Sequence, residues 1–148
     1  MLYPTAGSRL FIADYPADQG GTIPAAGWVE IGETEAIGIL GSEWDVETAD
    51  VVRDCGSGDV VEIAAKGVER RTEMPIIMGN DPTDTGQLLL WAAARSRSSY
   101  PFRLVFPDGV TQRSWFALVI RIGEVFDTAN VVMKLQADLK PTSAIERG

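Results

Sequence analysis

The sequence contains no histidine, and its 148 residues include a single cysteine. Without histidine the chain cannot build a Ser-His-Asp triad, a Cys-His dyad or a metal site that uses imidazole. Cys55 lies in an acidic turn, which disfavours the reactive thiolate, and a lone thiol is typical of synthesis in a reducing cytoplasm. We therefore expect no enzyme activity, no catalytic residue and no cofactor.

Carboxylate pairs remain as candidates for chemistry. Glu33 with Glu35, or Asp81 with Asp84, could bind Ca²⁺ weakly, but their spacing matches no EF-hand loop. A helix cap accounts for Asp81 and Asp84 more simply. We therefore expect no metal site.

Long apolar runs and basic residues are also scarce. No run approaches the roughly 20 apolar residues of a membrane span, and the N-terminus shows no secretory signal pattern, so we expect no membrane contact. The first 52 residues contain one base, Arg9, and nine acids, so this third carries the whole net charge of −8. An acidic surface repels phosphate and argues against tight binding of DNA.

The pattern of elements is strands, one helix, then strands. The predicted strands are 9–15, 28–39 with a break near Gly32, 43–47, 68–78, 100–106, 111–122 and 130–139, whereas 60–65 is an apolar run with one acid. This order predicts one α+β, mostly β domain over 1–148, a β-sandwich or barrel with one packed α-helix. Residues 46–66 are predicted to be a long inter-strand loop around a glycine-rich turn, and 140–148 an extended C-terminal arm.

The helix is predicted to begin at Asp81 as N-cap, with Pro82 in the first position. One face carries apolar residues at helical spacing and is predicted to face the core, namely Leu88, Trp91, Ala92 and the stem of Arg95. Leu90 lies nearly opposite this face. It therefore packs either against a second part of the same core or against a neighbouring subunit.

The last strand alternates between two kinds of side chain. Val131, Met133, Leu135, Ala137 and Leu139 form its apolar set. Asn130, Lys134, Gln136 and Asp138 form its polar set. Because side chains of a strand alternate between faces, we expect the apolar set to face the core and the polar set to face water.

Four ordered motifs in the C-terminal 60 residues carry a family resemblance. They are Gly86-Gln87 leading the helix, a hairpin over 102–109 ending in Phe-Pro-Asp-Gly, a strand end over 119–123, and a final strand closing over 139–143. With this spacing, the chain resembles the major tail tube proteins of long, non-contractile-tailed, lambda-like bacteriophages.

The resemblance implies a structural virion protein. It implies self-assembly into stacked, hexameric rings, with a tape-measure protein, tail-terminator and tail-tip proteins as partners. Genome DNA would pass through the bore, and the acidic first third would be either a solubilising face or a wall past which DNA slides. We expect the polar set Asn130, Lys134, Gln136 and Asp138 to face the bore. We expect Leu90, Val60, Val61 and Ile63 to lie at a subunit or ring interface.

Two other functions stay open. The tubes of contractile tails and type VI secretion share the fold that the resemblance implies. A small ligand-binding β-barrel, such as a flavin split barrel, would instead need a basic phosphate site. Its only candidates are Arg70-Arg71 and the pair Arg95 and Arg97.

Overall fold

The chain divides into two compact units, which we call the body (Met1–Leu40 with Glu73–Gly148) and the arm (Gly41–Thr72). The structure is a computed structural model that describes all residues except 1, 18–20, 55–57, 127–128, 130–131 and 148. The predicted residues Cys55 and Asn130 therefore lie outside the described residues. Within the described part, no helix is long and apolar enough to cross a membrane.

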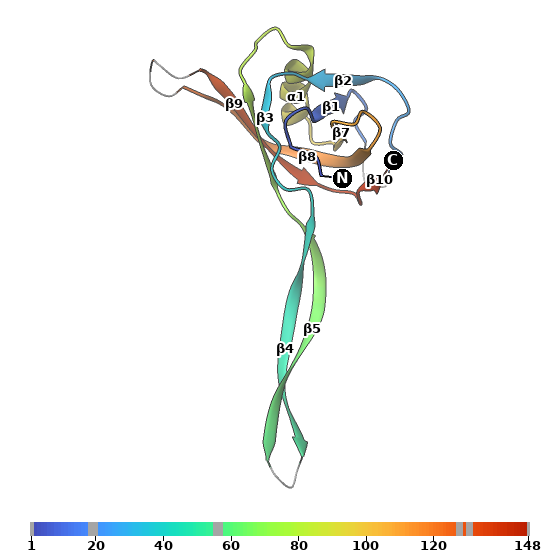
Figure 1. Ribbon diagram of the computed structural model, residues 1–148, viewed down its shortest axis with the longest axis vertical. Helices are drawn as coiled ribbons and strands as arrows, with labels where there is room; N and C mark the ends of the chain where they lie inside the picture. Colours follow the sequence, from blue (N-terminus) through green and yellow to red (C-terminus); the bar gives the residue numbers. More distant parts are fainter. Residues whose placement is uncertain (1, 18–20, 55–57, 127–128, 130–131, 148) are drawn as a thin grey trace. The chain divides into compact units, whose positions relative to one another are not determined.

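An antiparallel sheet forms the body, with the strand order β2-β1-β7-β8-β9-β6-β3 and β10 paired to β8 (Figure 1). Its strands are β1 (Arg9–Ala13), β2 (Trp28–Ile31), β3 (Thr34–Ala36), β6 (Met74–Gly79), β7 (Tyr100–Val105), β8 (Gln112–Val125), β9 (Lys134–Pro141) and β10 (Glu146–Arg147). The single helix α1 (Thr85–Arg95) packs against β1, β2 and β8. The predicted class, mostly β with one packed helix, is confirmed.

The core lies between α1 and one face of the sheet. The apolar set of β9 enters it as predicted at its described strand positions, because Leu135, Ala137 and Leu139 are fully buried. Phe102 of β7 stacks on Trp115 of β8, with ring centroids 6.2 Å apart. In β9 the apolar side chains at alternate positions are therefore the ones that enter the core, whereas β7 and β8 bury consecutive residues.

The C-terminal residues extend the sheet along β8. Beyond β9, the Thr142 N–H donates to the Phe116 carbonyl at 2.8 Å, and the Ser143 hydroxyl accepts from the Phe116 N–H at 2.9 Å. β10 then pairs with the start of β8. Part of the predicted C-terminal arm is thus the short strand β10 and the segment that connects it to β9. Both make hydrogen bonds to β8.

The start of α1 corrects the predicted cap. The N-cap is Asp84, whose Oδ2 accepts from the Gln87 N–H at 3.0 Å, and the helix begins at Thr85. Asp81 instead accepts from the N–H and hydroxyl of Thr83 and closes a turn before the helix. Both residues are Asp within one turn of the helix start, so local sequence alone could not choose between them.

The buried face of α1 is also different from the predicted one. Leu90 and Ala93 are fully buried with Gly86, whereas Leu88 is 53% exposed. Residues 86, 90 and 93 share a face at i, i+4 and i+7, and Gly86 lets the helix approach β2 closely on that side. The prediction that Leu90 lies at a subunit interface is therefore wrong, because it belongs to the core of its own body.

The arm is a two-stranded antiparallel hairpin made of β4 (Ser42–Asp54) and β5 (Asp59–Arg71). Figure 1 shows these strands twisting around each other as a ribbon. The described part of residues 46–66, predicted to be a loop, therefore belongs to two paired strands. Bulges interrupt their register between Trp44 and Val46 and between Val52 and Asp54.

Candidate assembly surfaces

The polar face of β9 carries charges that are balanced by neighbouring strands. Lys134 Nζ lies 3.1 Å from Glu35 Oε2 of β3, and Arg121 Nη1 of β8 lies 2.7 Å from Asp138 Oδ2. A β-bulge between Val119 and Arg121 shifts the register of β8 at this point. The face therefore pairs its acids with its bases.

Asp138 differs from the expectation of a fully solvated polar set. Its side chain is only 8% exposed, whereas that of Arg121 is 74% exposed. Lys134 and Gln136 are half-buried. The charge exposed at this position is therefore the Arg121 guanidinium, which the buried Asp138 carboxylate binds. That this face lines a bore remains a prediction.

The arm exposes apolar side chains on both faces of its ladder. Cross-strand pairing places Ala49 opposite Ile63 and Val51 opposite Val61 on one face. On the other face Val52 lies opposite Val60, and these two side chains are 52% and 62% exposed. A two-stranded ribbon has no core of its own and is only marginally stable in water. The predicted interface residues Val60, Val61 and Ile63 are thus exposed on the arm.

Two side-chain contacts join β4 to β5 at the end of the arm's ladder that is farther from its tip. Arg70 binds Asp45 through its Nε and Nη2, with the salt bridge at 3.0 Å, and this hydrogen bonding lowers the pKa of the Asp45 carboxyl. The ammonium of Lys66 lies 4.7 Å from the centre of the Trp44 ring. Arg70, one of the four arginines considered for a phosphate site, is therefore already paired with an acid.

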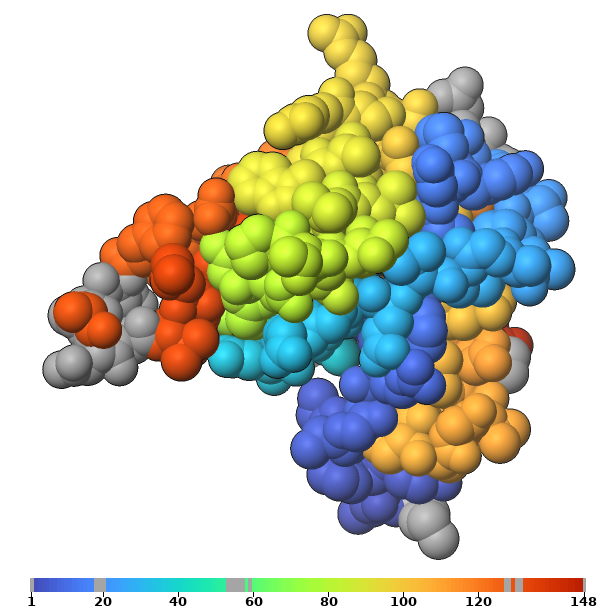
Figure 2. All heavy atoms as spheres, turned by 90° about the horizontal axis from the view of Figure 1, so that it is seen from above, coloured from blue at the N-terminus to red at the C-terminus, as the bar shows by residue number. Residues whose placement is uncertain are grey.

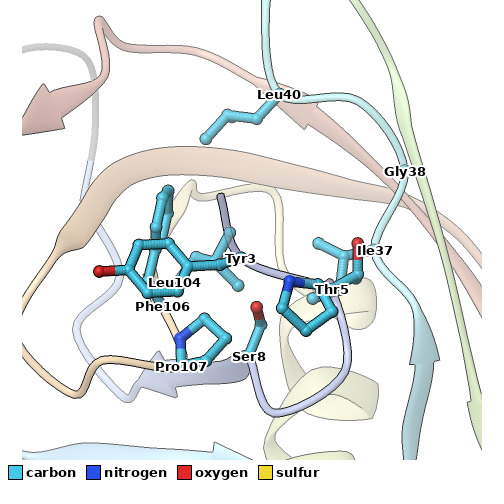
Figure 3. Close-up of a pocket in the computed structure, with 10 residues that line it drawn as sticks. Tyr3, Thr5, Ser8, Ile37, Gly38, Leu40, Leu104, Phe106 and Pro107 are labelled. Atoms are coloured by element: carbon cyan, nitrogen blue, oxygen red, sulfur yellow. The ribbon is translucent and has the colours of Figure 1, made fainter. Parts of the chain in front are cut away.

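An uncharged hollow of about 240 Å³ opens between the N-terminal segment and β7 (Figure 3). Its lining includes Tyr3, Ile37, Leu40, Leu104 and Phe106, and the rings of Tyr3 and Phe106 meet edge to face at 6.5 Å. Among the described residues that line it there is no lysine or arginine. It therefore lacks the basic group that a flavin phosphate needs.

A second surface groove, of about 410 Å³, follows the solvent side of α1. It is lined by Leu88, Trp91, Ala92 and Arg95, together with Glu124 of β8. This is the helix face that the sequence pattern assigned to the core. The other two phosphate candidates do not form a basic cluster in this groove, because Arg97 does not line it and Glu124 does.

Gln87 is a buried residue whose role the sequence analysis missed. It is 2% exposed, and its Nε2 donates to the carbonyls of Gly32 and Gly79 at 3.2 and 2.8 Å. Its Oε1 accepts from the Asp81 N–H at 3.0 Å. Figure 2 shows the segments that it joins, the light-blue and cyan β2–β3 region beside the green β6–α1 connection. The Gly-Gln pair in the resemblance indicated this position but not its contacts.

Three of the acidic candidates for Ca²⁺ have other roles: Asp84 caps α1, Asp81 closes the turn before it, and Glu35 pairs with Lys134. Asp84 Oδ2 also accepts from the Gly32 N–H at 3.1 Å, and the hydrogen bonds from Thr83 lower the pKa of Asp81. Among the described residues, no group of three or more metal-ligating side chains comes together.

Comparison with known proteins identifies the fold through structure alone. No protein-family model and no curated protein matches the sequence. A chain of the anti-feeding prophage (AFP) baseplate is similar with a TM-score of 0.68 and 14% identity, over 100% of this chain and 97% of that one. A chain of the SPP1 tail tube is similar with a TM-score of 0.65 and 12% identity, over 99% of this chain and 79% of that one. A chain from the tail of the empty GTA particle, a tail refined with C6 symmetry, is similar with a TM-score of 0.59 and 15% identity, over 95% of each chain.

These likenesses establish a tail-tube-like fold. They include a phage tail tube and a contractile injection system alike, since similar chains also occur in an extracellular contractile injection system, at its sheath/tube terminator. The fold therefore does not single out the non-contractile, lambda-like group that the sequence motifs suggested.

Proposed function

We propose that this chain is the tube subunit of a phage-like tail, a structural, non-enzymatic protein that self-assembles into stacked rings. The observation that carries the proposal is the likeness over nearly the whole chain to chains of a tail tube, a sheath-tube complex and a GTA tail. The exposed apolar arm supports it, because such a ribbon needs a surface on another molecule.

Six subunits would close each ring. The C6 symmetry of the GTA tail supports this number. The edge strands β2 and β3 support ring closure, since joining them between copies would satisfy open sheet edges. A tape-measure protein, tail-terminator and tail-tip proteins would be the other partners, and the protein would be made in the host cytoplasm and reside in the virion tail.

Electron microscopy of the purified protein tests the proposal. We expect colourless tubes whose cross-sections show rotational symmetry, formed either alone or when short tube fragments are added as seeds. A protein that stays monomeric at high concentration, with and without seeds, would contradict it. A stoichiometric flavin spectrum would favour the ligand-binding barrel, and tubes that bind a sheath protein would favour the contractile alternative.

The polar face of β9 would line the bore. In support, Lys134 and Arg121 are each paired with an acid, so the face would offer DNA few unpaired cations. Gln136→Lys should slow DNA ejection at low salt and less at high salt, because screening weakens the added attraction. Ala92→Lys adds the same charge on exposed α1 and should leave ejection unchanged. A density map with Gln136 on the outer surface would contradict the assignment.

The arm would lock one ring to the next through Val60, Val61 and Ile63. Amides of residues 60–65 should exchange hydrogen quickly in the monomer and slowly in the tube, because the ribbon gains a partner on assembly. Those of β9 from Leu135 to Ala137 should be protected in both states. Strong protection of 60–65 in the monomer would instead support a hairpin that is stabilised by its own subunit.

A further inference from the structure

Two arginines of the body lie directly opposite each other at the end of the sheet. β10 pairs with β8 so that Arg147 is the cross-strand neighbour of Arg113. Like charges in such positions destabilise a sheet. Arg113 donates to the Gln112 carbonyl at 2.8 Å and lies 5.0 Å from the centre of the Phe106 ring, and within the described residues no acid pairs with either arginine.

An apolar hollow adjoins this arginine pair. It has a volume of about 180 Å³ and is lined by Leu40, Leu104, Phe106 and Ile145, with both arginines at its margin. It shares Leu40, Leu104 and Phe106 with the larger hollow of Figure 3. The smaller hollow is thus an apolar depression with two cations at its margin, which is complementary to an apolar segment that carries acids.

The arm carries such a segment. Asp50 and Glu62 are direct cross-strand neighbours, and both are exposed. The next pair toward the tip on the same face is Val52 and Val60. Two residues of strand span about 6.8 Å, so the acids and the valines lie side by side on one surface. Within the described residues no base pairs with either acid.

We propose that the Arg113–Arg147 pair receives the Asp50–Glu62 pair of a second copy. The valines would enter the apolar depression while the guanidiniums bind the carboxylates, a geometry that favours bidentate contacts. Each copy alone contains two repelling like-charge pairs, and one contact would relieve both. This inference rests on the proposed self-assembly and names the surface that the arm would contact.

The groove along α1 fits the acid pair less well. It holds one base, Arg95, and one acid, Glu124, so its charge is balanced. A second carboxylate from the arm would have no base to meet there. The arginine pair therefore matches the acid pair in number as well as in sign.

Charge reversal tests the contact. Asp50→Lys with Glu62→Lys, and Arg113→Glu with Arg147→Glu, should each raise the concentration needed for assembly by at least about tenfold, because like charges would meet. The variant with all four changes should recover to within about threefold of the wild type. Mixing the two double variants should yield mixed assemblies, which a contact within one chain would not produce. Arg95→Glu with Arg97→Glu makes the same change elsewhere and should have little effect.

Neutral variants keep the test valid if reversals fail to fold. Asp50→Asn with Glu62→Gln, and Arg113→Gln with Arg147→Gln, should weaken assembly non-additively, since each removes the same interaction. Additive losses, unaffected double variants, or no rescue in a folded fourfold variant would overturn the inference.

The outcome for the wild type separates the two proposals. Tubes that form equally well from the reversal variants would overturn only the contact. If the wild type forms no tubes, the proposed function fails, and sedimentation at low and high salt still tests the contact. No salt-sensitive self-association in that case would overturn the contact too.

Discussion

Gly86 is the residue at which α1 comes closest to β2, and its replacement gives a sharp test of the fold. A Cβ built at this position overlaps the Glu30 carbonyl oxygen and lies 2.7 Å from the Ile31 Cα. Both obstacles are backbone atoms, and Ile31 is paired with Leu10 of β1. The clash therefore cannot be relieved by rotating a side chain.

Two opposing effects decide the sign of Gly86→Ala. Helix propensity alone favours alanine over glycine by about 1 kcal/mol. Relieving the clash requires α1 to move by several tenths of an ångström or more, which disturbs the packing of Leu90 and the hydrogen bonds of Gln87. Overpacking of this kind costs about 1–3 kcal/mol and sometimes more. Because the obstacles are backbone atoms, the cost should lie in the upper part of that range, and subtracting the gain in helix propensity leaves a net loss of about 1–2 kcal/mol in the free energy of unfolding.

Urea unfolding, followed by the fluorescence of the buried Trp115, measures this loss. Gly123→Ala is the matched control, because a Cβ there meets no atom within 4 Å. We expect that variant to lie within about 0.5 kcal/mol of the wild type or to be slightly more stable. If Gly86→Ala is as stable as the wild type or more so, the close approach of α1 to β2 is wrong.

Three other predictions follow from contacts in the body. Leu90→Asp should abolish folding because it buries an unpaired charge, whereas Leu88→Asp should fold, and circular dichroism distinguishes these outcomes. Asp84→Ala should cost about 1–3 kcal/mol in urea unfolding, because the helix loses its cap and a second backbone N–H loses its acceptor. Hydrogen bonds from Thr111 lower the pKa of Asp108 to about 2 from 3.8, so their stabilisation is present above pH 3.8 and is lost as pH falls toward 2. Asp108→Asn should flatten the fall of Tm in that window, and an unchanged slope would contradict this.

Sequence periodicity predicted the body's strands well where one face is buried. Residues 100–106 and 111–122 correspond to β7 and most of β8, and Leu135 to Leu139 alternates as expected. A shift of one residue would move every apolar side chain of such a strand into water. The pattern is therefore strongly constrained, and it can be recognised without knowing the partner strands.

The helix shows what periodicity cannot decide. Leucine occurs on both sides of α1, at Leu88 and at Leu90, so the sequence offers two apolar faces. Gly86 selects the buried one, because only a residue without Cβ allows contact with β2 on that side. Selecting it requires the position of β2, which lies more than fifty residues earlier in the chain.

Candidate assembly surfaces depend even more on strand register. The pairing of Arg121 with Asp138 follows from a bulge in β8, and the facing of Asp50 with Glu62 follows from the ladder of the arm. Neither is visible in local sequence. The arm itself was predicted as a loop because neither strand has one apolar and one polar face, and alternation is the signal by which isolated strands are recognised.

Some surfaces of the subunit pair each acid with a base, whereas others place like charges next to each other. Ion pairs such as Arg9–Glu30 and Lys134–Glu35 join acids to bases within one subunit. The acid pair on the arm and the arginine pair on the body place like charges face to face. Such pairs weaken an isolated subunit and strengthen a contact that joins them. A subunit built in this way should gain more from assembly than its exposed apolar area alone would provide, and that gain should fall as salt rises.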